Sequence, residues 1–519
     1  MSAYSNIFGA KCSEVAYGRI MESVETAQGR IKTIALNRGQ LRWEAFDLES
    51  LISADHPART IWQLSGRFDL SRFEQPRKTR EGDAGRPCWA AQLLVSVWVY
   101  SYTLGVASAR AIERMMSHEP GLRWLVADLR INHHTLADFR VGHQEALQEL
   151  FAQFLALLET AGMVDLKTLL HDGTKVRAVA GKASLHRRKT LEKRLRQARK
   201  VVGELDRQAA AEPEGMDERR RAAQERAAQE ALQRAVQALN KLKELEAEAE
   251  ARKRDQLRVS ESEPEARNMK QSDGGWAPSY NVQVSTEVQS RMIVGIGVTS
   301  AANDTQELMP ALEKVKENCG ALPQQIIADN GYATRSNVER TSEQKVELIA
   351  PWKEDDAREA GACAANGIAE EFAPSAFGLE RDGQKMICPA GKSWVVIGQT
   401  KKHGLLREVF QARRADCARC VWRKPCCGAS GGPRRITRVV ESEAMKRYLA
   451  RMKRPEIRKL YRKRSEIAEF PHLWAKAVKK WRRFSVRGLV KAGIEATWVA
   501  LAYNVAQWMR IRKVGTATA

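Results

Sequence analysis

Two aspartates follow short apolar runs that predict strands, which places carboxylates where a metal ion can be held. Asp172 follows Leu-Leu-His at 169–171, and Asp329 follows Ile-Ile-Ala at 326–328. Carboxylates at neighbouring strand ends converge, and converging carboxylates bind hard cations such as Mg²⁺. Two such ions, about 4 Å apart, activate a nucleophile and stabilise the leaving oxygen in phosphoryl transfer. A lone aspartate at a strand end is more often a turn residue or a helix cap, so a third ligand is needed.

The third candidate ligand lies in a strongly basic helical segment near the end of the chain. Residues 446–491 contain seventeen Lys or Arg and only three acids. The presence of an acidic residue among so many Lys and Arg side chains favours a role for it as a metal ligand. Glu466 satisfies a surface ion pair with its basic neighbours better than Glu469 does, so Glu469 is the preferred ligand. Glu466 and then Glu495 are the alternatives.

The charge of the whole chain indicates a polyanionic partner. Its 519 residues include 86 Lys and Arg against 63 Asp and Glu, which gives a formal net charge of +23. Hydrophobic residues make up 43 %, which excludes a wholly disordered chain. The most apolar stretch, 90–107, is interrupted by polar residues and predicts a buried helix, not a membrane span. Nucleic acid is therefore the preferred partner, and Arg464 and Lys476 would hold its phosphates near the acids.

Hydrophobic patterning predicts the elements that position these acids. Strands are expected at 163–176, 280–286, 292–298 and 325–332, with a helix at 307–315. This order describes an α/β core that is interrupted by two insertions. In the first insertion, apolar residues recur at alternating spacings of four and three residues along Leu191–Leu205 and again along Ala228–Leu242. The pattern is interrupted at 212–215. It predicts an antiparallel helical hairpin with a coiled-coil seam.

Five cysteines gather in the second insertion. Cys417 and Cys420 form a CxxC pair, Cys426 and Cys427 follow, and Cys388 precedes them on a turn. Four thiolates close a tetrahedral structural zinc site, for which Cys388, Cys417, Cys420 and Cys426 are the candidates. Reduced thiols without metal are the competing interpretation. The remaining cysteines are scattered and are expected to be reduced thiols.

Ahead of the first aspartate, residues 85–143 predict several short helices. A polar turn at 132–135 leads into the helix that contains Arg140. This arrangement is typical of a DNA-binding helix-turn-helix and equally of a plain helical bundle. No signal peptide is readable in the first thirty residues.

Several motifs, in order along most of the chain, carry a resemblance to one family. They are GRPCWAAQLL, RINHHTLADFR, HDGTKVRA around Asp172, YNVQV, TSAANDTQEL, IIADNGY around Asp329, and the block at 461–504 around Glu469. The chain resembles DDE transposases of bacterial insertion sequences, in the branch called insertion-sequence family 1182. The resemblance implies an RNase H-like core in which Asp172, Asp329 and Glu469 hold two Mg²⁺ or Mn²⁺ ions. It also implies cleavage at terminal inverted repeats and attack of the freed 3′-hydroxyl on target DNA.

Related families carry the signature Tyr-x₂-Arg-x₃-Glu-x₆-Lys around the glutamate. Tyr461, Arg464, Glu469 and Lys476 match it with one additional residue between Arg and Glu, and Asn330 stands where a Lys is expected. Tyr461, Arg464 and Lys476 are therefore expected to contact DNA. A catalytically decayed DNA-binding protein and a non-transposing RNase H-like nuclease remain as alternatives.

The expected fold class is α/β, with a mixed sheet flanked by helices as the RNase H-like core. The expected division is an N-terminal segment at 1–60, a helical DNA-binding domain at 61–160, a catalytic core at 161–185, 258–345 and 441–519, a helical hairpin at 186–257 and a Cys-containing insertion at 346–440. We expect double-stranded DNA as partner, a homodimer, no membrane association and a bacterial cytoplasmic location at the nucleoid. For the helical hairpin, three interpretations stay open: it mediates dimerisation, it contacts DNA, or it has no function of its own.

Overall fold

A computed structural model describes residues 47–75, 87–211, 218–352, 363–380, 385–402, 404–430 and 432–517 of the chain. The chain divides into two compact units, 1–50 and 51–519. All the strands among the described residues lie in the second unit, together with every candidate site residue.

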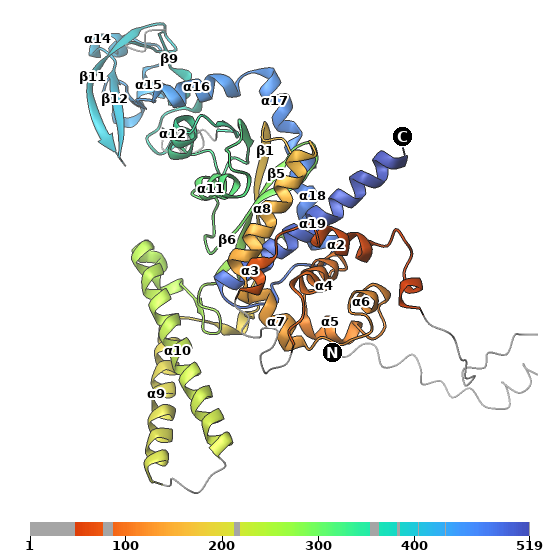
Figure 1. Cartoon of the computed structure of the whole chain (residues 1–519). Helices are drawn as coiled ribbons and strands as arrows, with labels where there is room; N and C mark the ends of the chain where they lie inside the picture. Colours follow the sequence, from red (N-terminus) through yellow and green to blue (C-terminus); the bar gives the residue numbers. More distant parts are fainter. Residues whose placement is uncertain are drawn as a thin grey trace, which may run out of the picture. The chain divides into compact units, whose positions relative to one another are not determined.

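A mixed sheet forms the centre of the second unit (Figure 1). Its strand order is β4 (Arg267–Lys270), β5 (Trp276–Glu287), β1 (Thr168–Arg177), β7 (Gln325–Ile327) and β8 (Glu347–Ile349), and β6 (Ile293–Thr299) also pairs with β5. β5 is antiparallel to β1, β4 and β6, while β1, β7 and β8 are parallel. The predicted strands at 280–286 and 292–298 are confirmed as the β5–β6 hairpin, with β5 beginning earlier.

The position of the first aspartate agrees with the strand predicted at 163–176 and corrects the interpretation that placed Asp172 at a strand end. Asp172 lies inside β1, which continues to Arg177. The reason is that β5 offers partners along the whole of β1, so the backbone groups beyond Asp172 remain paired. Asp329 does follow its strand, two residues after Ile327, although β7 is shorter than the predicted 325–332.

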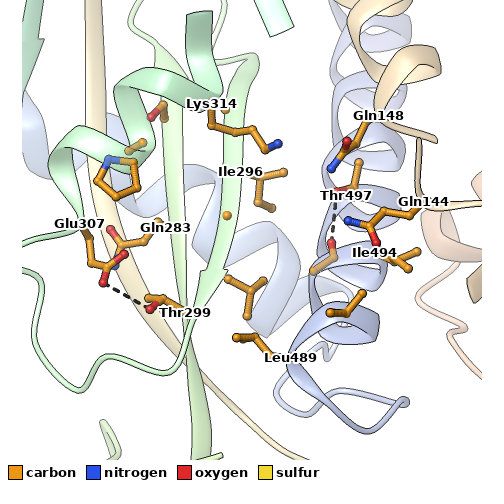
Figure 2. Close-up of a pocket in the computed structure, with 18 of the residues that line it drawn as sticks. Gln144, Gln148, Gln283, Ile296, Thr299, Glu307, Lys314, Leu489, Ile494 and Thr497 are labelled. Atoms are coloured by element: carbon orange, nitrogen blue, oxygen red, sulfur yellow. Dashed lines mark hydrogen bonds between the residues drawn. The ribbon is translucent and has the colours of Figure 1, made fainter. Parts of the chain in front are cut away.

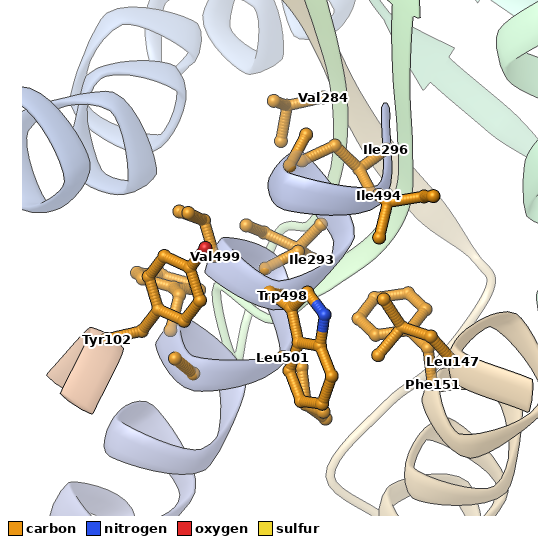
Figure 3. Packing of buried hydrophobic residues seen from close by; sticks show 14 of the residues in the cluster. Tyr102, Leu147, Phe151, Val284, Ile293, Ile296, Ile494, Trp498, Val499 and Leu501 are labelled. Carbon is orange, nitrogen blue, oxygen red and sulfur yellow. The ribbon is translucent and has the colours of Figure 1, made fainter. Parts of the chain in front are cut away.

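Several helices of the second unit precede β1, and three of them pack on the last long helix of the chain. The helices before β1 are α2 (Pro57–Ser65), α3 (Ser71–Glu74), α4 (Ala91–Thr103), α5 (Ala109–Met115), α6 (Pro120–Leu125), α7 (His133–Gly142) and α8 (Gln144–Thr160). The turn η1 (Leu48–Leu51) comes before them in the sequence. Helix α19 (Leu489–Ala517) contacts α4, α7, α8 and β6. Figure 3 shows Trp498 of α19 among Tyr102 of α4 and Leu147 and Phe151 of α8. One apolar core therefore joins these helices to the sheet.

The apolar helix predicted at 90–107 is α4, and nearly all of it is buried. No helix of the described residues has the length and apolar character needed to span a membrane. Helix α7 follows the polar turn as predicted, but its only Lys or Arg, Arg140, is buried. The exposed face of α7 therefore presents no cation to a phosphate.

The predicted helical hairpin is present as α9 (Arg188–Ala211) and α10 (Glu218–Glu248), which lie side by side (Figure 1). Leu191 of α9 is buried against Leu239 and Leu242 of α10, and all three are seam positions of the predicted pattern. Off the seam, Val201 is exposed, as the four-and-three spacing requires. The short elements η2 (Lys182–Ser184), β2 (Leu185–His186), η3 (Ala251–Gln256) and β3 (Val259–Ser260) flank the hairpin.

The Cys-containing segment, which was predicted to be an insertion at 346–440, has an antiparallel sheet of its own. Its strands are β9 (Gly378–Leu379), β10 (Lys385–Ile387), β11 (Ser393–Lys402), β12 (Leu405–Gln411) and β13 (Arg435–Val439), with α14 (Arg414–Ala418), α15 (Arg423–Cys427) and the turns η4 (Glu370–Phe372), η5 (Pro374–Ala376) and η6 (Gly428–Ser430). Phe377, Trp394 and Phe410 form its core. The remaining helices are α11 (Leu308–Cys319), which confirms the prediction at 307–315, α12 (Arg335–Glu343), α16 (Glu443–Met452), α17 (Pro455–Arg462), α18 (Arg464–Leu473) and a π-helical turn, η7 (Trp474–Val478).

Candidate functional site

Asp172 of β1 is held by two side chains from α18. Arg464 Nη2 donates to Asp172 Oδ1 at 3.0 Å, and His472 Nε2 lies 3.5 Å from Asp172 Oδ2. The helix is fixed there because Ile467 and Ala468 pack on Leu170, two residues before the aspartate. Spacings of three and four residues put these side chains on one helix face. Apolar packing and ion pairing thus bring α18 to the same point of the sheet.

The second aspartate lies close enough to the first for their charges to interact. Burial raises the pKa of Asp329, and the charges of Asp172 and Asp304 raise it further, against the Gly331 N–H and the charge of Arg464. The Gly331 N–H donates to Asp329 Oδ1 at 2.7 Å. In the parallel register of β1 and β7, Leu170 pairs with Ile327, and each aspartate follows its paired residue by two positions.

The pKa of Asp172 moves the other way. Burial acts to raise it, but the hydrogen bond and charge of His472 and the charge of Arg464 outweigh burial and keep the pKa below its ordinary value. Asp172 is consequently the more readily ionised of the two carboxylates.

Lys476, from the π-helical turn after α18, lies on the same side of β1. Its Nζ donates to Thr174 Oγ1 at 2.5 Å and to the Lys175 carbonyl at 2.8 Å. Burial lowers the pKa of Lys476 to about 8, the charge of Arg482 lowers it as well, and the charge of Asp172 opposes both. The side chain of Lys476 is thus held near Asp172 in surroundings whose burial makes its protonated form less stable than in water.

Glu469 is not joined to the two aspartates. Its side chain is exposed and lines an open cavity of about 500 Å³, together with His472 and Lys476. The other residues that line this cavity are Lys175, Arg177, Gln271, Ser272, Asp273, Leu473, Ala477 and Arg482. The alternative Glu466 is exposed, and Glu495 is buried, where it accepts from Trp481 and Ser485. Tyr461 is half-buried on α17.

The fit of these residues to a divalent metal is partial. Asp172 and Asp329 supply the carboxylate oxygens that hard cations prefer. Across the described ranges, however, no group of three or more His, Cys, Asp or Glu side chains is placed to hold a metal ion. Arg464 and His472 face the two oxygens of Asp172, and the expected third carboxylate of Glu469 is not grouped with the aspartates. The predicted three-acid set is therefore not assembled in this arrangement.

Sequence reasoning missed a polar network on the other face of the sheet, behind the aspartates. Asp304, in the loop between β6 and α11, accepts from Asn281 and Gln283 of β5. Gln283 also contacts His171 and Tyr332, the near neighbours of the two candidate acids. The motif that contains Asp304 was recognised in the sequence. Its acid was overlooked because it follows no strand directly and lies among loop-forming residues.

A cavity of about 330 Å³ adjoins this network (Figure 2). Gln283, Thr299 and Glu307 line one side of it, and Gln144 and Thr497 line the other. Burial raises the pKa of Glu307, the charge of Asp304 adds to this, and the Thr299 hydroxyl opposes it by donating at 3.2 Å. Gln283 thus belongs both to the network around Asp304 and to the lining of this second cavity.

The five clustered cysteines line one cavity of about 480 Å³ in the insertion. Burial raises the pKa of Cys426 to about 12, and the charges of Cys427, Cys417 and Cys420 act in the same direction against that of Arg434. A zinc ligand has to be a thiolate, and the described residues contain no three-ligand group for a metal. The predicted zinc site gains no support from this geometry.

Two family models match parts of the chain. A transposase DDE domain matches residues 387–509, which include Glu469, Arg464 and Lys476. A second model, Transposase domain (DUF772), matches residues 46–142. Together the matches support a DDE transposase family. Asp172 and Asp329 lie outside both matched segments, so their assignment rests on the geometry of the sheet. The search among curated proteins found no match.

Such a domain implies nuclease and strand-transferase activity in general, and DDE transposases generally use divalent metals. The mixed sheet with flanking helices is consistent with this family.

Proposed function

We propose that this DDE transposase cuts DNA at terminal inverted repeats and transfers the freed 3′-hydroxyl ends to target DNA. The observation that carries the proposal is the ion pair between Asp172 and Arg464 of the matched DDE segment, on a strand whose parallel neighbour β7 leads into Asp329. Clustered carboxylates beside Arg and Lys are what phosphoryl transfer on a polyanion requires.

The strand order supports an RNase H-like core as part of this proposal. Three antiparallel strands, β6, β5 and β1, are followed by the parallel strands β7 and β8. The two aspartates come from β1 and from the end of its parallel neighbour β7. The parallel register of these two strands supports a position for the two aspartates next to each other.

The basic face that leads to the acids is our proposed DNA surface. Helix α17 has no buried residue, and its apolar side chains are only half-buried. Exposed cations that form no ion pair with another described residue are Lys453, Arg454, Arg458, Lys459, Arg462 and Lys463. Contacts between such cations and phosphates fix the position of a protein on DNA and supply most of the salt-dependent part of its affinity for DNA. Tyr461, Arg464 and Lys476 would continue this surface to Asp172.

We further propose that Mg²⁺ or Mn²⁺ is held by Asp172, Asp329 and Glu469. A bound divalent ion would activate the attacking oxygen and stabilise the leaving one. In the protein alone, Arg464 and His472 contact the two carboxylate oxygens of Asp172 and hold the side chain in place. The structural zinc expected at Cys388, Cys417, Cys420 and Cys426 is not part of the proposal.

The test is cleavage of a duplex that carries the inverted repeats flanking the coding sequence. We expect nicking that depends on Mg²⁺ or Mn²⁺, followed by joining of the 3′ end to a target duplex. Nicking without joining would indicate a nuclease that does not transpose. Binding without nicking under any metal would indicate a decayed enzyme. Light scattering of the DNA complex tests the homodimer that would pair two ends.

DNA affinity is expected to depend on pH through Lys476. Its pKa of about 8 means that the free protein loses this positive charge as pH rises from 7 to 9. DNA favours the protonated form, so the dissociation constant should rise over that interval by up to about tenfold, by linkage. Fluorescence anisotropy with a labelled duplex at constant ionic strength measures this. Lys476→Arg keeps its charge and should remove the pH dependence; an equal dependence in both proteins would contradict the assignment.

A further inference from the structure

The overlooked carboxylate of Asp304 binds two amides at one oxygen. Asn281 Nδ2 donates to Asp304 Oδ1 at 2.6 Å, and Gln283 Nε2 donates to the same oxygen at 2.7 Å. An ionised carboxylate only accepts hydrogen bonds. The amide of Gln283 is therefore fixed with its NH₂ group toward Asp304 and its carbonyl oxygen turned away.

The orientation of Gln283 sets the direction of the hydrogen bonds beyond it. Its Oε1 lies 2.6 Å from the Tyr332 hydroxyl and 2.8 Å from His171 Nε2, so both of these atoms donate to it. With its proton on Nε2, neutral His171 accepts at Nδ1, where the Ser285 hydroxyl lies at 2.9 Å. A single acceptor, Asp304, thus determines the tautomer of a buried histidine.

This chain of hydrogen bonds supports both candidate aspartates. His171 precedes Asp172 on β1, and Tyr332 closes the turn that carries Asp329. The rings of His171 and Tyr332 meet edge to face, with centroids 4.9 Å apart.

Space for the network depends on the residue after Asp172. A Cβ atom on Gly173 would lie 2.6 Å from Asp304 Oδ1, 2.7 Å from Gln283 Nε2 and 3.0 Å from the Tyr332 oxygen. Contacts below 3.0 Å force neighbouring atoms to move. The glycine therefore lets the network approach β1 directly behind the acid.

We propose that Asp304 is a positioning residue for the candidate site, acting through Gln283 on His171 and Tyr332. The inference rests on the proposed function for its effect on DNA cleavage, but the hydrogen-bond relay can be measured without it. Loss of an outer partner of this kind typically lowers activity by about 10–100-fold.

The experiment compares Asp304→Ala with Asp304→Asn in the full chain. Asn keeps an acceptor oxygen for the two amides, whereas Ala removes it. In ¹⁵N-histidine NMR, with His171 assigned by His171→Gln, we expect the Nε2–H tautomer in the wild type and in Asp304→Asn. Asp304→Ala should show a mixture of tautomers. Its nicking rate should fall at least about tenfold at unchanged DNA affinity, and Asp304→Asn should stay within about threefold of the wild type.

The outcomes separate this proposal from the proposed function. A wild-type His171 with its proton on Nδ1 would overturn the relay, as would equal nicking by Asp304→Ala and the wild type. Equal losses in Asp304→Asn and Asp304→Ala would show that the negative charge, not the acceptor, is needed, and would also overturn it. If Asp304→Ala does not fold, Gln283→Leu can replace it, because this substitution removes the amide that links Asp304 to His171 and Tyr332. It should likewise give a mixture of His171 tautomers and slower nicking. A wild type that never nicks DNA would overturn the proposed function, while the tautomer would still decide the relay.

Discussion

Asp172→Asn is expected to abolish metal-dependent nicking while leaving the fold and DNA binding in place. The substitution keeps the shape of the side chain and removes the charge that faces Arg464 and His472. Asn cannot replace a carboxylate as the partner of a hard cation. We expect a loss of more than about a hundredfold, beyond the 10–100-fold typical of outer partners. Single-turnover nicking measures the rate, and anisotropy measures the affinity.

A matched control is available seven residues upstream on the same segment. Asp165 is also an aspartate paired with a cation, Lys167, but it is exposed. Asp165→Asn should therefore leave nicking unchanged. An Asp172→Asn protein that nicks like the wild type would contradict the assignment of the site. Comparison of Glu469→Gln with Glu466→Gln and Glu495→Gln then decides which glutamate completes the set.

The parts of the fold that follow local patterning were predictable from the sequence. The seam of the helical hairpin, the β5–β6 hairpin and the apolar face of α11 each depend on spacing along one element. The two aspartates could be selected as candidates because each follows an apolar run. Their position relative to one another and to α18 was not predictable, since strand order and the docking of α18 depend on contacts between distant residues.

Two features of the site show this limit. The strand that contains Asp172 was predicted, but its antiparallel pairing with β5 along residues 169–177 is a contact between distant segments that the sequence around the aspartate does not indicate. Asp304 acquires its role only through side chains of β5 and of the turn after β7. In the same way, Arg140 of α7 is buried against a distant segment of the chain, around Ser485. The sequence left this helix open between a helix-turn-helix and a plain helical bundle, and the packing gives its arginine a structural role.

That buried arginine leads to the largest stability effect we expect. Arg140 Nη1 donates to the Ala107 carbonyl at 2.6 Å and to Ser485 Oγ at 2.7 Å, and its guanidinium lies 4.8 Å from the centroid of the Trp98 ring. Ser485 in turn donates to Glu495 Oε2 at 2.8 Å. Burial raises the pKa of Glu495, and the charge of Arg140 opposes that rise. Arg140 and Glu495 thus form a buried charge pair bridged by a hydroxyl.

Arg140→Met should destabilise the protein by about 3–5 kcal/mol, because it leaves the buried carboxylate of Glu495 without its counter-charge. Urea unfolding followed by tryptophan fluorescence measures the change. Arg130→Met is the control: Arg130 is 71 % exposed and pairs with Glu113, so its loss should cost less than about 1 kcal/mol. Adding Glu495→Gln to Arg140→Met should recover part of the lost stability, because no buried charge then remains.

The pair also connects the two segments matched by the family models, since Arg140 lies in the first and Glu495 in the second. If these segments are one folding unit, wild-type unfolding is a single transition, and Arg140→Met shifts it as a whole. If Arg140→Met instead produces two transitions, the charge pair is what couples the N-terminal helices to the segment with the proposed DNA surface. A shift no larger than that of Arg130→Met would show that apolar packing around Trp498 joins them without the charges.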